Sequence, residues 1–193
     1  MAIISADPDA SRINPVTRKP RTQDGVTPET RSSQALGYVL AATRLSLGWV
    51  FLWAFLDKLL GLGHNTTSAK SWLNGGSPTK GFLGSASAGP FSGFYHSIAG
   101  NGFIDALFMA ALVAIGTALI LGIALRITAA AGVLLTVMMW SAVLPPDSNP
   151  FMDDHLIYAL VLIALALAKA GHTLGFGSLW DRFPIVNRYA VLR

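Results

Sequence analysis

The residues that could do chemistry in this chain are a few polar side chains at the ends of long apolar segments. Asp57 and Lys58 close the first apolar segment, Asp105 opens the second, and Asp154 and His155 open the last. Partly desolvated acids, amines and imidazoles can have shifted pKa values and can transfer protons. We expect these five residues to form a catalytic set, with Asp154 and His155 as a proton pair and Lys58 holding an anionic oxygen.

Aromatic side chains are candidates for holding a ligand beside that set. Trp140 and Tyr158 are expected at the same level of the molecule, and Trp72 lies in the loop that would cover them. The alternative interpretation is that the acids only mark where helices meet water, because the dipole at a helix start favours a carboxylate.

Arg44 is a second candidate for cofactor binding. It lies about two helical turns inside the first apolar segment and shares a helix face with Gly48, Phe51 and Phe55. An unpaired cation at that depth costs several kcal/mol. Its partner could be a backbone carbonyl, a hydroxyl group, Asp181, a lipid phosphate or a ligand. The structural alternative is that Arg44 locks helices together or snorkels towards the headgroups.

Four apolar segments must position these residues, and they cover residues 36–60, 103–125, 127–144 and 155–170. A bilayer-spanning helix needs about 20 mainly apolar residues. The chain of 193 residues is 52% hydrophobic and only 12% charged, against about 25% charged in soluble domains. We therefore predict an all-α membrane protein, a four-transmembrane-helix up-and-down bundle over residues 35–175.

The loop between the first two predicted helices, residues 62–102, is expected to be structured. It combines glycines and serines with many aromatic residues, which flexible linkers lack. Ordered loops of this length are commonly functional. We expect it either to cover the outer end of the bundle as a cap or to anchor its aromatic side chains at the level of the lipid headgroups.

The distribution of lysine and arginine predicts the orientation in a prokaryotic cell membrane. Most of them lie in residues 1–34, at Arg126 and in residues 169–193. Basic residues favour the cytoplasmic side, so both termini are expected inside and the loop at 62–102 outside. Residues 1–34 should form a flexible tail, and residues 176–193 an interfacial tail that contacts anionic lipid or a protein partner. The net charge of +4 follows this topology and implies no nucleic-acid partner.

Small residues in the second apolar segment predict a helix contact. Ala106, Ala110, Ala114, Ala118 and Gly122 recur every four residues. Helices in membranes associate through close packing of small residues. We expect this stripe to face a neighbouring helix.

The composition excludes several kinds of site. The chain has no cysteine, which rules out a disulfide framework, a thiolate metal site and thiol–disulfide electron transfer. No spacing matches a zinc site, so no metal is predicted. Haem is a poor fit because, among the four histidines, only His155 is placed on a predicted span.

Four segments resemble the DoxX/DoxD family of four-span prokaryotic membrane proteins, over about residues 40–177. They read RLSLGWVFLWAFLDKLLGLG, SWLNGGSPTKGFLGSASAGPFSGFYHSIAG, IGTALILGIALRITAAAG and PFMDDHLIYALVLIALALAKAG. The second segment is similar to the DoxD branch, which includes the large subunit of an archaeal thiosulfate:quinone oxidoreductase.

That resemblance implies a membrane subunit associated with quinone-linked electron transfer, working beside partner subunits. The DoxA partner of the archaeal enzyme has no counterpart in this chain, so a complete activity would need another polypeptide. Two alternatives stay open. One is a non-catalytic accessory or scaffold subunit of a respiratory or other membrane complex, and the other is a small lipid or solute pathway, suggested by Arg44.

Overall fold

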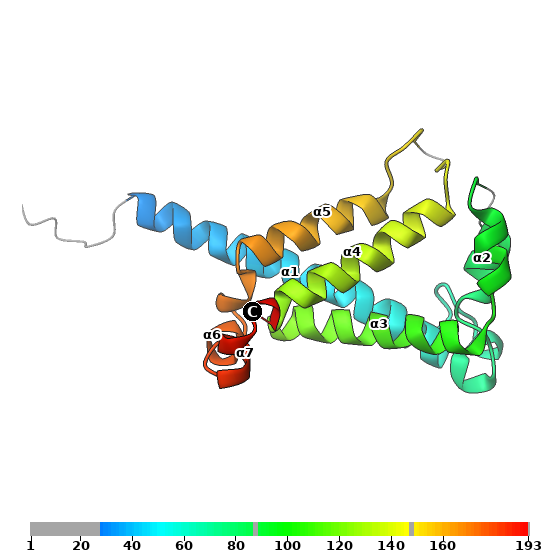
Figure 1. Cartoon of the computed structure of the whole chain (residues 1–193), viewed down its shortest axis with the longest axis horizontal. Helices are drawn as coiled ribbons and strands as arrows, with labels where there is room; N and C mark the ends of the chain where they lie inside the picture. The colour runs from blue at the N-terminus through cyan, green and yellow to red at the C-terminus, as the bar shows by residue number, and fades with distance from the viewer. Residues whose placement is uncertain (1–27, 87–88, 147–148, 193) are drawn as a thin grey trace, which may run out of the picture.

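The protein is all-helical in the part of the chain that this computed structural model describes, residues 28–86, 89–146 and 149–192 (Figure 1). Its main helices are α1 (Pro28–Leu60), α3 (Gly102–Leu121), α4 (Leu125–Ala142) and α5 (Asp154–Leu167). In those residues α1, α3 and α4 are long and apolar enough to cross a membrane, and α5 is a shorter apolar helix. The chain is therefore a multi-pass membrane protein, as predicted.

Several helix ends differ from the predicted ones. Helix α1 begins at Pro28 instead of residue 36, because proline suits the first turn, where its missing N–H is not needed. The predicted flexible tail is thus partly helical, and residues 1–27 lie outside the described residues. Gly122 and Lys169 adopt left-handed backbone angles, with φ of 73° and 50°. A left-handed residue ends a helix, so α3 and α5 stop several residues early.

Each main helix packs against the next one along the chain. Figure 1 shows α1, α3, α4 and α5 running back and forth along the same long direction, and contacts join α1 to α3, α3 to α4 and α4 to α5. The shared core is apolar and includes Leu47, Phe51, Met109, Leu112, Ile115, Leu119, Leu162 and Leu165. Consecutive packing of this kind needs only short connections, such as the turn at residues 122–124.

The predicted alanine stripe on α3 is wrong. Ala106, Ala110 and Ala114 are exposed, and the buried face of α3 carries Met109 and Ile115 instead. With 3.6 residues per turn, a step of four residues overshoots one turn by about 40°. Over the whole stripe this drift carries the small residues around to another side of the helix.

Two other glycines make the close contact between α1 and α3. A Cβ added to Gly116 would lie 2.7 Å from the backbone nitrogen of Leu52 and 3.0 Å from the carbonyl oxygen of Gly48. A Cβ on Gly48 would in turn meet Leu119 Cβ and Ile120 Cγ1, both at 3.0 Å. The two backbones therefore approach to a distance that only glycine permits.

Residues 62–86 and 89–101 form a folded segment, which we call the cap. It contains short helical turns at Ser68–Lys70, Trp72–Asn74 and Phe82–Ala86, followed by helix α2 (Ser92–Ile98). Figure 1 shows α2 at one end of the bundle, which we call the cap end. Anchoring of its aromatic side chains in lipid headgroups stays a prediction.

The opposite end, which we call the tail end, is closed by the C-terminal segment. This segment contains α6 (Gly177–Trp180) and α7 (Pro184–Arg188), with single turns at Ala170–His172 and Ala190–Leu192 (Figure 1). The backbone N–H of Phe176 donates to the carbonyl of Leu121 at 2.8 Å, and Arg126 Nη1 donates to the carbonyl of Ala190 at 2.9 Å. The segment is therefore tied to the junction of α3 and α4.

Replacing Gly116 by alanine should destabilise the contact between α1 and α3. The new Cβ would press on the main chain of α1, and overpacking of this kind costs about 1–3 kcal/mol. The free energy of unfolding, measured by denaturant titration in detergent micelles, should fall by that amount. Gly102→Ala is the matched control, because a Cβ at Gly102 on the same helix meets nothing within 4 Å. Equal stability of the two variants would contradict the close contact.

Candidate functional site

Asp105 anchors the cap to the start of α3. Its side chain is buried, and Oδ1 accepts hydrogen bonds from Ser77 Oγ at 2.9 Å, from the backbone N–H of Thr79 at 3.1 Å and from Thr79 Oγ1 at 2.6 Å. Hydrogen bonds to a carboxylate are stronger than those between neutral groups. Asp105 therefore fixes the fold of residues 77–79.

Asp57 does the same for the beginning of the cap. It is buried at the end of α1, and its two carboxylate oxygens accept the backbone N–H groups of His64 at 3.3 Å and Asn65 at 3.1 Å. The Asp57 and Asp105 carboxylates, expected to be catalytic, thus bond to the cap. The structure gives them a structural role in ordering this segment.

A cavity of about 360 Å³ lies between the cap, α3 and α4. Its walls are almost entirely hydrocarbon, aromatic ring or thioether, and the lining residues are Lys58, Pro78, Thr79, Phe82, Leu83, Tyr95, Ile98, Ile104, Leu107, Phe108, Ala111, Ala131, Leu134, Leu135, Met138 and Met139. Ligand sites commonly have this composition, with a few polar groups that set orientation. The cavity is therefore the candidate binding site.

Lys58 is the free polar group in the wall of this cavity. The hydroxyl of Thr79 is already bonded to Asp105, and the hydroxyl of Tyr95 donates to the carbonyl of Met138 at 2.9 Å. Lys58 is partly buried and makes no hydrogen bond or ion pair within the described part of the chain. An ammonium group carries three donors, so it is positioned to bind an oxygen acceptor of a ligand.

His155 is paired with Asp153 rather than with Asp154. Its Nδ1 lies 2.6 Å from Asp153 Oδ2, while Asp153 Oδ1 caps α5 by accepting the N–H of Leu156 at 3.1 Å. Asp154 is exposed. The expected proton pair therefore involves Asp153, because a capping residue before the helix points back at its first turn.

The His155 ring also contacts the wall of the cavity. Its centroid lies 6.4 Å from that of Phe82, which lines the cavity from the cap. The predicted cluster is thus divided: Lys58 lines the cavity, His155 lies behind Phe82, and Asp57 and Asp105 bond to the cap.

The three aromatic candidates do not line this cavity. Trp140 donates its Nε1–H to the carbonyl of Phe151 at 2.8 Å in the connection between α4 and α5. Tyr158 packs against the apolar core, and Trp72 lies in a turn of the cap that contacts α1. None of them is among the residues that line the cavity.

Arg44 joins three parts of the chain at the tail end. It is fully buried, and Nη1 donates to the carbonyls of Leu119 and Ile120, the latter at 2.9 Å. Nη2 donates to the carbonyl of Leu174 at 2.8 Å and more weakly to that of Thr173 at 3.5 Å. Of the possible partners of Arg44 named from the sequence, backbone carbonyls are the groups that it contacts in the structure.

These bonds explain how a cation can be buried without a carboxylate. The last carbonyls of a helix lack intrahelical donors and lie at the negative end of its dipole. Gly122 makes room for the arginine, since a Cβ there would lie 2.9 Å from Arg44 Nη1, and a Cβ on Gly175 would lie 3.0 Å from Nη2. Arg44 therefore locks α1 to the end of α3 and to the C-terminal segment, and a role in cofactor binding stays a prediction.

Sequence reasoning missed most of the residues that line the cavity. Phe82, Leu83, Tyr95, Met138 and Met139 are apolar or aromatic residues of a kind that fills any membrane protein. No spacing marks them, because the cap folds back from a distant part of the chain. The sequence feature that pointed to this region was the unusual number of aromatic residues in the long loop at residues 62–102.

The comparisons with known proteins do not extend these observations. No family model matches the chain, and neither a curated protein nor a solved structure matches it. In the described residues there is also no group of three or more histidine or acidic side chains that could hold a metal ion. The feature that bears on function is therefore the cavity between the cap, α3 and α4.

Replacing Arg44 by lysine should strongly destabilise the fold. A single ammonium group cannot reach carbonyls on both α3 and the C-terminal segment, and each buried carbonyl left without a donor costs about 1–3 kcal/mol. We expect a lower unfolding midpoint in detergent, measured by thermal unfolding. Arg182→Lys is the matched control because Arg182 is exposed. An Arg44→Lys variant as stable as the wild type, with weaker ligand binding, would favour the ligand role.

Proposed function

We propose that this protein is a DoxX/DoxD-like membrane subunit associated with quinone-linked electron transfer. The observation that supports this proposal is the apolar cavity of about 360 Å³ with the unpaired Lys58 in its wall. A quinone has an apolar ring and tail and two carbonyl oxygens, so it matches a cavity with one free donor. A bound quinone would supply the electron-accepting group.

The chain's own residues have defined roles in this proposal. Lys58 donates a hydrogen bond to a ligand oxygen and stabilises negative charge on it, since charge-assisted bonds are the strong ones. Phe82 and the methionines of α4 exclude water from the ring. The pair of His155 and Asp153 lies behind Phe82 and exchanges protons with solvent near the cap.

The proposal requires partners, because the chain has no cysteine and no metal-binding cluster in its described residues to carry electrons. We place the electron donor on a separate protein subunit. The choice of donor, and any likeness to thiosulfate:quinone oxidoreductase, rests on the sequence resemblance.

We further propose that α5 is a fourth span and that both termini are cytoplasmic. Helix α5 has 14 residues, about 21 Å at 1.5 Å per residue, which is short for a bilayer core of about 30 Å. It packs along α4, and Asp153 and Lys169 flank its ends as polar residues. The four helices then form an up-and-down bundle with the cap outside the cell.

The absence of cysteine makes this topology directly measurable. Thr67→Cys in the cap and Ser178→Cys in the C-terminal segment each place one thiol at an exposed position. In intact cells a membrane-impermeant maleimide should label the Thr67→Cys variant only, and both variants should react after the membrane is permeabilised. Labelling of the Ser178→Cys variant from outside would place the C-terminus outside and overturn the proposed orientation.

A scaffold subunit without a redox step is the second candidate function. It is favoured by the use of both buried carboxylates, Asp57 and Asp105, to fold the cap. Co-purification with a larger complex whose turnover survives replacement of Lys58 and His155 would select it. The third alternative, a lipid or solute pathway at Arg44, gains no support, because that side chain is fully buried among carbonyls.

Filling the cavity should abolish quinone binding. Ala131→Phe places a ring where the small side chain now lines the cavity, and Lys58→Met removes the free donor. We expect the first variant to retain no quinone after purification, by mass spectrometry. The second should bind a short-chain quinone about 10- to 100-fold more weakly in a titration, as expected for a lost charge-assisted hydrogen bond.

Two neighbouring substitutions serve as controls. Ala130→Phe changes an exposed residue of the same helix outside the cavity lining, and Lys70→Met removes an exposed lysine of the cap. Both should bind quinone like the wild type. Wild-type protein that neither retains nor binds a quinone would refute the proposal, as would equal effects of the Lys58 and Lys70 variants.

A further inference from the structure

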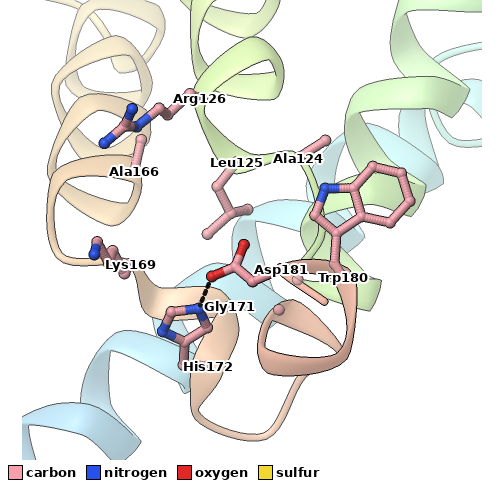
Figure 2. A pocket seen from close by; sticks show the side chains of 11 residues that line it. Ala124, Leu125, Arg126, Ala166, Lys169, Gly171, His172, Trp180 and Asp181 are labelled. Carbon is pink, nitrogen blue, oxygen red and sulfur yellow. Dashed lines mark hydrogen bonds and ion pairs between the residues drawn. The ribbon is translucent and has the colours of Figure 1, made fainter. Parts of the chain in front are cut away.

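A second cavity lies at the tail end, remote from the cap (Figure 2). Its volume is about 30 Å³, and its walls come from the turn between α3 and α4, the end of α5 and the beginning of the C-terminal segment. Figure 2 shows Arg126 and Lys169 on one side of it and the pair formed by His172 and Asp181 on another. The cavity has room for small polar groups only.

The charges around this cavity are predominantly positive. Asp181 is the acidic residue among those that line it, and its Oδ2 lies 2.9 Å from His172 Nε2. The side chain of Lys169 has no hydrogen-bond or ion-pair partner in the described part of the chain. Within the described residues the Arg126 side chain makes one hydrogen bond, to the carbonyl of Ala190, and a guanidinium group carries five donors. Two cations are therefore left to bind an anion.

The first turn of α4 adds to this positive field. Ala124, Leu125 and Arg126 line the cavity, and no side chain caps the helix at Ala124. The free N–H groups of a helix start therefore lie beside the two cations. Phosphate oxygens are well matched to a combination of arginine, lysine and backbone N–H groups.

The surface around the cavity indicates where the anion comes from. The C-terminal segment exposes a series of large apolar side chains, each half or more exposed, namely Leu174, Phe176, Leu179, Phe183, Ile185 and Tyr189. Such side chains are stable at the boundary between headgroups and acyl chains. A phosphate reaching Arg126 and Lys169 at that level belongs to a phospholipid.

We propose that the tail-end cavity binds the phosphate of an anionic phospholipid through Arg126 and Lys169. Asp181 is paired with His172, and the two cations outnumber this one acidic residue of the lining. The bound lipid links the turn between α3 and α4 to the end of α5 and so stabilises the part of the fold that the C-terminal segment closes. This site is independent of the quinone proposal, because it lies at the other end of the bundle.

The test compares lipid binding to four forms of the purified full-length protein in neutral detergent. The forms are the wild type, the single variant Lys169→Gln, the double variant Arg126→Gln/Lys169→Gln, and the control double variant Arg182→Gln/Arg188→Gln. The control removes two charges from the nearby C-terminal segment, at exposed positions outside the cavity. The probes are fluorescent phosphatidylglycerol, fluorescent phosphatidylcholine and inorganic phosphate as competitor.

We expect the wild type to bind phosphatidylglycerol more tightly than phosphatidylcholine. Lys169→Gln should weaken phosphatidylglycerol binding about fivefold and the double variant about 25-fold, since each basic residue near an anionic membrane contributes about that factor. The control variant should change binding less than twofold. The Lys169 side chain makes no hydrogen bond or ion pair in the described residues. The Lys169→Gln variant should therefore fold, and it gives the decisive result if the double variant fails to fold.

Two results would overturn the proposal. Equal losses in the cavity variants and the control would show that diffuse surface charge, and not this cavity, attracts the lipid. Displacement of the lipid by millimolar inorganic phosphate, with no difference between the two lipids, would assign the site to a soluble anion.

Discussion

The fold depends on burying the cation of Arg44 with backbone carbonyls, and not a carboxylate, as its partners. Arg44 lies inside the first membrane helix, where an uncompensated charge would cost several kcal/mol. The cost is offset because α3 ends beside it at the left-handed Gly122, where the carbonyls of Leu119 and Ile120 accept hydrogen bonds from the guanidinium group. The same side chain also binds the carbonyl of Leu174. A single guanidinium group therefore fixes where α3 stops and where the C-terminal segment returns.

This lock has consequences for the rest of the bundle. With α1 and α3 held together at the tail end, the glycines Gly48 and Gly116 allow their backbones to stay in close contact along the middle. At the other end lies the cap, whose fold is fixed by carboxylates at Asp57 and Asp105. The larger cavity lies at that end. The tail end is thus held by the hydrogen bonds of Arg44, and the cap end contains the larger cavity.

The polar residues at the cap end divide into two groups by what they bond to. Asp57 and Asp105 are satisfied by donors of the cap, whereas the Lys58 side chain makes no hydrogen bond or ion pair in the described residues and lines the cavity. Buried carboxylates with several hydrogen-bond donors are commonly structural. A partly buried amine beside an apolar cavity is a candidate ligand-binding group. The functional proposal therefore rests on Lys58 and on the pair formed by His155 and Asp153.

The sequence by itself determined the helical class, the membrane environment and the positions of the long apolar helices, because hydrophobic length is a local property that a bilayer selects directly. It also identified Arg44 as unusual, since an unpaired charge deep inside an apolar segment is costly. It did not determine which small residues pack, because the four-residue spacing from Ala106 drifts around the helix while the contact falls on Gly116. Nor did it separate the carboxylates that hold the cap from the residues around the cavity. Those partners are distant in the chain, and only the tertiary structure decides which donors reach a carboxylate and which side chain is left without one.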